Sequence, residues 1–194
     1  MRRIVLAMMT TLNGRLDDPD AWVTGISEDH YEEIDRGYAG FDTILVGRTT
    51  AAEMIDYWPG ARAAPAAAGA HRRMAERMHT YRKYVVTTDP GLTLAWHNAE
   101  PVTAPDDAAL RTFVADLKDR PGADIHLSGG ARLAQSFVRL GLIDEFRFSV
   151  FPVHSPGATW FDGLDGPLNL ELIGSRSFEN GAVALHYRPG TAPA

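Results

Sequence analysis

The stretch "DIHLSGGARLAQSFVRLGLIDEFRFSVFPV" (residues 124–153) changes its hydrophobic pattern repeatedly within one segment. A short apolar run, typical of a strand, ends at the glycine pair Gly129 and Gly130. The next residues have helical spacing, with one apolar face formed by Leu133, Phe137 and Leu140. The segment "DEFRFSVFPV" then alternates, which predicts a strand whose wetter face carries Arg147 and Ser149. The glycine pair therefore marks a strand-to-helix junction, where a tight turn and close approach of a ligand to the backbone explain it equally well.

Two further apolar runs, "IVLAMM" (4–9) and "DTILVG" (42–47), are nearly unbroken. Such runs are typical of strands that are covered on both faces, as in a parallel or mixed sheet with helices on each side. Between them, residues 27–40 predict a helix, with Ser27 available as its N-cap and Gly40 as its stop. Together these segments predict a strand, helix, strand unit at the centre of the fold.

Residues 47–60, "GRTTAAEMIDYWPG", predict a second helix. Thr50 and Glu53 have the spacing of a capping box, so the helix is expected to begin at Thr50 or beside it and to close at Pro59-Gly60. The run that follows, "ARAAPAAAGA" (61–70), is low in complexity and fits either a mobile loop or a poorly anchored helix.

The rest of the chain alternates strand and helix patterns. The segments "KYVVTTD" (83–89) and "LTLAW" (92–96) predict strands, and residues 106–118 predict a helix with one apolar face. Residues 168–189 predict two strands joined by a turn at Asn180-Gly181, which is an antiparallel hairpin. The expected fold class is α/β, with a mostly parallel mixed sheet.

Composition narrows the function classes. The 194 residues are 45% hydrophobic, which fits a single domain over residues 1–194. A net charge of −6 gives no general support for nucleic-acid binding. The absence of Cys excludes disulfides and thiolate zinc sites and fits a cytoplasmic protein, and the His spacing shows no metal motif. The N-terminal apolar run ends at Asn13-Gly14, too early for a signal peptide or a membrane span, so no membrane partner is expected.

A second junction, "VGRTT", delivers Gly47, Arg48, Thr49 and Thr50 from a buried strand to a helix N-terminus. An anion there would meet backbone N–H groups, the positive end of the helix dipole and a guanidinium fork. A helix cap with a solvated arginine is the alternative. Ligands of open α/β sheets collect at the carboxyl ends of strands, so a dinucleotide could reach both this junction and the glycine pair.

These motifs, taken in order, resemble the dihydrofolate reductase-like fold and, within it, the reductase domain of the bacterial bifunctional riboflavin-biosynthesis deaminase-reductase. The resemblance covers almost the whole chain and rests on "TTLNG", "DTILVGRTT" with "YWPG", "KYVVTT", the stretch 124–153 quoted above and the "WFDG" after it. No deaminase zinc signature is present, so the resemblance is to a stand-alone reductase domain.

The resemblance implies a homodimer that binds NADPH at the carboxyl ends of the strands. The aromatic residues of "FRFSVFPV" (146–153), on a strand expected close to a sheet edge, also favour a homodimer. The resemblance also implies a cis peptide between Gly129 and Gly130. Arg48 and Thr49 would hold phosphates, Thr87 and Thr88 would lie near the adenosine ribose, and the glycine pair would pass the pyrophosphate. The full expected cofactor set is Ala7, Asn13, Gly14, Gly47, Arg48, Thr49, Thr87, Thr88, Ser128, Gly129, Gly130, Ala131 and Arg132.

The chain departs from the family pattern in two places. Asn13 stands where relatives of the riboflavin enzyme often carry Asp, which removes a charge near the reacting end. Asp89 follows Thr88 where a basic residue would help to bind a 2′-phosphate, which weakens the expected preference for NADPH over NADH. Asn13 and Glu33 are the candidates for catalysis; Glu33 belongs with Asp29 and Glu32 to the acidic residues of the first helix, where a solvated helix face is the alternative.

Three functions fit these observations. The first is an NADPH-dependent reductase that acts on a small heteroaromatic or carbonyl-like substrate, a pterin or a riboflavin precursor for example. The second is a nucleotide- or pterin-binding protein of the same fold without turnover, because no acid or base can be assigned. The third, an interaction or structural domain, requires both junctions to be coincidental.

Overall fold

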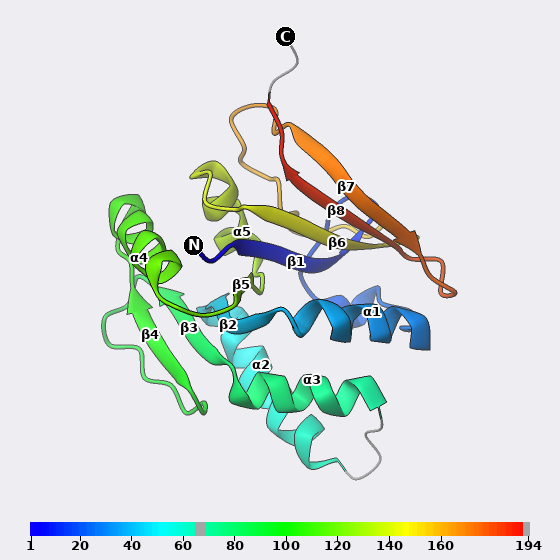
Figure 1. Cartoon of the computed structure of the whole chain (residues 1–194), viewed down its shortest axis with the longest axis horizontal. Coiled ribbons are helices and arrows are strands. Elements are labelled where there is room, and N and C mark those ends of the chain that lie inside the picture. Colours follow the sequence, from blue (N-terminus) through cyan, green and yellow to red (C-terminus); the bar gives the residue numbers. More distant parts are fainter. Residues whose placement is uncertain (65–68, 192–194) are drawn as a thin grey trace.

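The computed structural model describes residues 1–64 and 69–191, and their strands form one eight-stranded sheet with the order β4-β3-β2-β5-β1-β6-β8-β7 (Figure 1). The pairs from β4 to β6 are parallel, and β6, β8 and β7 pair antiparallel. The strands are β1 (Ile4–Thr11), β2 (Phe41–Gly47), β3 (Arg82–Thr87), β4 (Ala99–Thr103), β5 (Asp124–Leu127), β6 (Glu145–Phe151), β7 (Leu170–Ser177) and β8 (Val183–Pro189). The predicted mixed sheet and its C-terminal hairpin are confirmed.

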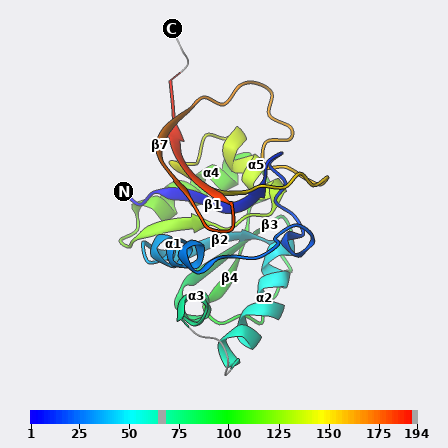
Figure 2. The ribbon, with the colours of Figure 1, turned by 90° about the vertical axis from the view of Figure 1, so that its right-hand side faces the viewer.

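Helices cover both faces of the sheet (Figure 2). They are α1 (Glu28–Tyr38), α2 (Arg48–Ala63), α3 (Gly69–Thr80), α4 (Asp107–Asp119) and α5 (Ala131–Arg139), with a short 3-10 helix at Pro19–Ala21. Leu45 of β2 packs in a core with side chains of α4 and α5. Ile44 and Val46, its neighbours on the same strand, pack in a second core with side chains of α2 and α3. The apolar run of β2 is therefore buried on both faces, as its unbroken pattern predicts.

The second helix differs from the prediction at both ends. α2 begins at Arg48, two residues before Thr50, with Gly47 as an N-cap that has no side-chain hydrogen bond. It also continues through Pro59 to Ala63. Bonds to α3 on both sides of Pro59 hold the last turns in place, namely Tyr57 Oη to His71 Nε2 at 2.9 Å and Arg62 Nε to Glu76 Oε2 at 2.8 Å. Residues 65–68 of the run "ARAAPAAAGA" lie outside the described residues.

Two strand assignments need correction. Residues 92–96, "LTLAW", form no strand; Trp96 is buried in the second core, and the edge of β3 is paired instead with β4. The aromatic run of β6, expected close to a sheet edge, lies inside the sheet between β1 and β8. In both cases the apolar side chains fill a core. Local sequence does not show whether an apolar run fills a core as a loop or as a strand, nor whether a strand lies inside the sheet or at its edge.

Candidate functional site

The central strands β1 and β5 part at the carboxyl end of the sheet. They are paired only from Ile4 to Leu6 on β1 and from Ile125 to Leu127 on β5, whereas β1 stays paired with β6 as far as Thr11. A cavity of about 1720 Å³ lies at this end of the sheet and reaches from α1 to the start of α5. An opening at the carboxyl ends of parallel strands is the usual place for a ligand in an α/β sheet.

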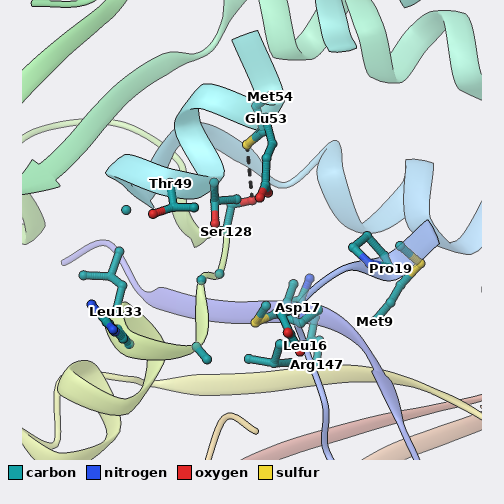
Figure 3. A pocket seen from close by; sticks show the side chains of 18 of the residues that line it. Met9, Leu16, Asp17, Pro19, Thr49, Glu53, Met54, Ser128, Leu133 and Arg147 are labelled. Atoms are coloured by element: carbon teal, nitrogen blue, oxygen red, sulfur yellow. Dashed lines mark hydrogen bonds between the residues drawn. The ribbon is translucent and has the colours of Figure 1, made fainter. Parts of the chain in front are cut away.

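Most of the residues predicted from the sequence meet at this cavity. Those that line it are Ala7, Gly47, Arg48, Thr49, Thr87, Thr88, Ser128, Gly129, Gly130, Ala131 and Arg132. They come from the middle of β1, from the carboxyl ends of β2, β3 and β5 and from the first residues of α2 and α5. Figure 3 shows Thr49, Glu53 and Met54 of α2 on one side of the cavity and Met9 and Arg147 on the other.

Two helices begin at the cavity without a side-chain cap. Gly47 precedes α2 and Gly130 precedes α5, and neither N-cap position provides a side-chain acceptor. The first N–H groups of a helix have no partner within the helix and carry its positive dipole end. Arg48 and Arg132 are exposed at these two starts, and neither side chain has a hydrogen bond or ion pair in the described part of the chain. The cavity therefore has two positively polarised corners suited to phosphate groups.

The glycine pair makes the turn into α5 through its backbone angles. Gly129 has φ +51° and Gly130 has φ +76°, both values that favour glycine. A Cβ on Gly129 would lie 2.3 Å from Met8 Cε, and one on Gly130 would lie 3.0 Å from Thr50 Oγ1. Every peptide bond in the described residues is trans, so the expected cis bond is wrong. Two consecutive positive φ angles produce the bend instead.

A buried histidine holds the backbone of β1 where it leaves β5. His126 Nε2 is 3.0 Å from the carbonyl oxygen of Ala7, which only an N–H at that nitrogen can bond, so the ring carries its proton there. The ring stacks on Phe41 and meets Tyr38 edge-on, and burial lowers the pKa of His126 to about 4. The histidine is therefore neutral, and it satisfies a carbonyl that the strand ladder leaves at the cavity.

The loop after β1 does not bring its predicted residues to the cavity. Asn13 Nδ2 donates to the carbonyl of Ser155 at 2.9 Å, and its Oδ1 accepts a hydrogen bond from Thr11 Oγ1 at 2.7 Å. Gly14 has φ +77°, and a Cβ there would lie 2.3 Å from the ring of Phe161. Neither residue lines the cavity, and both make contacts that shape the loop.

The acidic residues of α1 are divided by the structure. Glu33 lines the cavity, where its carboxylate pairs with Arg36 and, at 2.9 Å, with Arg176. Asp29 and Glu32 do not line it. A hydrogen bond from Ser27, which is the larger cause, and one from the backbone of Glu179 hold the pKa of Asp29 below its usual value. Glu33 is the carboxylate of this group that a ligand could reach.

The far end of the cavity lies beyond β3. Thr87 is buried and its Oγ1 accepts a hydrogen bond from the N–H of Asp89 at 3.0 Å, while Thr88 is exposed. Asp89 lines the cavity and its Oδ1 accepts from Gly91 N–H at 2.8 Å. Asp106 caps α4 at the same end, so carboxylates surround this part of the cavity.

Sequence reasoning missed several residues that line the cavity. They are chiefly Met9, Met54, Tyr57, Trp58, His71, Arg147, Ser149 and His186. The alternation of β6 singled out the face of Arg147 and Ser149 but could not show that β1 and β8 place it beside the cavity. No group of three or more His, Asp or Glu side chains in residues 1–64 and 69–191 could hold a metal ion. None of the helices in those ranges is long and apolar enough to cross a membrane.

The strand order, the C-terminal hairpin and the opening beside β1 define a protein with the dihydrofolate reductase-like fold. The chain belongs to the RibD C-terminal domain family, whose model matches residues 2–184. It is 30% identical to the uncharacterized proteins YyaP and YwjB of Bacillus subtilis (strain 168), in each case over 96% of this chain and over 94% and 97% of the relative.

Solved structures show the same fold at low identity. A pyrimidine reductase-like protein of Corynebacterium diphtheriae matches with a TM-score of 0.66 at 14% identity, over 98% of this chain and 93% of that one. The deaminase/reductase of Thermotoga maritima named for 5-amino-6-(5-phosphoribosylamino)uracil matches with 0.65 at 16% identity, over 97% of this chain and 57% of that longer protein. Dihydrofolate reductase from Enterococcus faecalis, solved with NADP(H), matches with 0.62 at 12% identity over 97% of both chains.

Proposed function

We propose that the protein is an NADPH-dependent reductase that transfers hydride to a small heteroaromatic or carbonyl-like substrate. Its membership of the RibD C-terminal domain family supports a reductase role. The observation that carries the cofactor assignment is the pair of uncapped helix starts at one cavity, each with an arginine that has no partner among the described residues. Such corners are suited to the phosphates of a dinucleotide.

The residues at the cavity can be given roles on this proposal. Arg48 and Thr49 at the start of α2 would bind phosphate, and Arg132 with the first N–H groups of α5 would bind the pyrophosphate. The adenosine would lie toward Thr87 and Thr88, where Asp89 is a poor neighbour for a 2′-phosphate. We expect NADPH to bind more tightly than NADH, with Asp89 reducing the difference.

The chain's own contribution to the reaction would be to bind and orient. When bound, NADPH would supply the hydride, and Ala7, whose carbonyl His126 holds, would lie beside the nicotinamide. The nicotinamide ring would enter where β1 and β5 part. It would then lie between the starts of α2 and α5, which bind the phosphates, and the face of the sheet that packs against α1.

The first experiment is a calorimetric titration with NADPH and NADH. Arg48→Ala is expected to weaken NADPH binding by about 1 to 3 kcal/mol, because a charge-assisted contact is lost, and to leave the melting temperature nearly unchanged. Arg62→Ala is the matched control, since Arg62 lies on the same helix but pairs with Glu76 and does not line the cavity. Equal NADPH affinity in the Arg48 variant and the parent would contradict the assignment.

A binding protein without turnover remains the second candidate, because the cavity-lining Glu33 is already paired with two arginines and is poorly placed to act as an acid or base. NADPH oxidation measured against a panel of pterins, pyrimidines and small carbonyl compounds separates the two. Tight NADPH binding with no oxidation across the panel would favour the binding protein.

A further inference from the structure

We propose that the substrate of this cavity carries an anionic group, a carboxylate or a phosphate, and that Arg147 binds it. This inference rests on the proposed function, because it assigns the substrate end of the same cavity. The assignment comes from the sheet face that packs against α1. There Arg147 and Ser149 of β6 and His186 of β8 line the cavity.

Arg147 is held in place with most of its donors unused. Its Nε donates to Glu145 Oε1 at 2.6 Å, and its guanidinium carbon lies 5.7 Å from the ring centroid of Phe41. The side chain is only 22% exposed. Its Nη1 and Nη2 make no hydrogen bond in the described part of the chain, and Nη1 lies beside Gly37 of α1, where an added Cβ would be 4.0 Å away. A planar donor fork fixed in this way suits bidentate binding of a carboxylate or a phosphate.

The carboxylate that fixes Arg147 does not cancel its charge at the cavity. Glu145 is shared, because Arg3 Nη1 also bonds Glu145 Oε2 at 2.7 Å. Arg3 is balanced in turn by Asp124. Neither Glu145 nor Asp124 lines the cavity, whereas Arg147 does. The positive end of this network therefore faces the cavity and its negative end faces away.

The neighbours of Arg147 also present donors. Asn180 is oriented by its bonds to Gly25 and Ala182, so its Nδ2 donates to His30 Nδ1 at 3.2 Å. His30 must then carry its proton on Nε2 and donate to Ser149 Oγ at 2.9 Å. The hydroxyl proton of Ser149 is left to donate in its turn.

His186 stands directly beside Arg147 in the antiparallel register of β8 and β6. Burial and, to a lesser extent, the charge of Arg147 hold the pKa of His186 below its ordinary value, which favours a neutral ring with one N–H donor. Two carboxylates that also line the cavity are already bonded to arginine, Glu33 to Arg36 and Arg176 and Asp17 to Arg15. The groups that β6 and β8 present to the cavity, namely Arg147, Ser149 and His186, are thus mainly donors, which a substrate with an acceptor or anionic edge would satisfy. Asp20 and Glu53 also line the cavity, but they belong to the 3-10 helix and to α2.

The test uses pairs of compounds that differ in charge at one position. Orotate is compared with orotamide, pterin-6-carboxylate with its carboxamide, and ribose 5-phosphate with ribose, each titrated by calorimetry into the full chain. The titrations are run with and without saturating NADP⁺, so that phosphate binding at the helix starts is separated from binding at β6. NADP⁺ titration alone reports on the proposed cofactor, and its failure leaves the comparison of charged and neutral probes intact.

At least one charged probe is expected to bind better than its neutral partner, and Arg147→Gln is expected to weaken that probe alone by about tenfold or more. Glu145 keeps Arg3 as a partner in this variant, so the fold is retained. Arg147→Lys keeps the charge but loses the fork and is expected to fall between the two. Arg188→Gln, an exposed β8 arginine paired with Glu171, is the control for net charge. Failure of every charged probe to bind, undiminished binding by Arg147→Gln or an equal loss in Arg188→Gln would overturn the proposal.

Discussion

Lys83 is a fully buried lysine that closes the end of α3. Its Nζ donates to the carbonyls of Met78 and Tyr81, each at 2.7 Å, and lies 4.9 Å from the ring centroid of Trp96. Burial among these groups lowers the pKa of Lys83 to about 8. The folded chain therefore releases this proton at a lower pH than the unfolded chain does.

This difference predicts a pH dependence of stability. Because the unfolded state binds more protons between about pH 8 and pH 10, the free energy of unfolding contributed by Lys83 rises with pH across that window, by roughly 2 kcal/mol. Urea unfolding of the parent and of Lys83→Met at pH 7 and pH 10 measures this rise as an increase in the parent's free energy of unfolding relative to that of the variant. A parent-minus-variant value that stays constant or falls with rising pH would show that the carbonyls hold the ammonium charged.

Gly130 is a second residue whose substitution is expected to change the free energy of unfolding. Its φ of +76° and the hydroxyl of Thr50, which would lie 3.0 Å from an added Cβ, both oppose a side chain. Gly130→Ala is expected to lower the free energy of unfolding by about 1 to 3 kcal/mol and also to weaken NADPH binding. Gly60→Ala, in open space within α2, is the control and should be neutral or slightly stabilising. A Gly130 variant with the parent's melting temperature would contradict the strain described for this turn.

At the scale of elements, α1 and α3 are joined by one carboxylate. Asp35 of α1 is buried and pairs with Arg73, at 2.8 Å, and with Arg77 of α3. Asp35→Asn removes the negative charge and one of the two acceptor oxygens that these arginines share, and it is expected to lower the free energy of unfolding by roughly 1 to 3 kcal/mol. Glu76→Gln, which breaks an exposed pair between α2 and α3, should cost less than about 1 kcal/mol. Chemical denaturation of both variants checks the ranking, and equal losses would contradict it.

The elements that could be predicted are those whose local pattern has a single solution. The unbroken runs of β1 and β2 and the Asn180-Gly181 turn determine strands and a hairpin without knowledge of their neighbours. The extension of α2 through Pro59 depends on contacts with α3, which no local pattern contains. The segment 92–96 is apolar because it fills a core, and apolarity alone does not separate that from a strand.

Part of the cavity could also be predicted, because local patterns show where buried strands end. Gly47 and Thr87 are the last residues of buried strands, Gly129 follows another, and the carboxyl ends of parallel strands meet at one edge. Arg147 could not be found in this way, because its position depends on the cross-strand register with Ala7 and His186. Asn13 was placed by resemblance, and its bond to Ser155 depends on a loop far away in sequence.

At the scale of the whole molecule, the two sheet edges differ. β4 carries Pro101 within the strand, which lacks an N–H and opposes pairing with another chain. β7 has no proline and exposes Leu172 and Ile173, at 53% and 47%. We therefore predict a homodimer whose interface includes β7.

Sedimentation equilibrium at micromolar concentration is expected to give twice the chain mass of 21.2 kDa. Ile173→Asp should shift the protein toward the single-chain mass, because a charge is then buried at the interface. Leu12→Asp, an equally drastic change at an exposed residue outside β7, should not. A parent protein that sediments at 21.2 kDa would rule out the dimer.

The parting of β1 and β5 has a mechanical consequence. Because these strands are neighbours in the middle of the sheet and share only three register pairs, the sheet consists of two leaves, β4-β3-β2-β5 and β1-β6-β8-β7, with a short seam between them. The helix starts at α2 and α5 follow strands of the first leaf, whereas Arg147 belongs to the second. A molecule that reached from one to the other would add a connection across the seam, whereas one confined to either leaf would leave the seam held only by these three pairs and by the apolar core that crosses it.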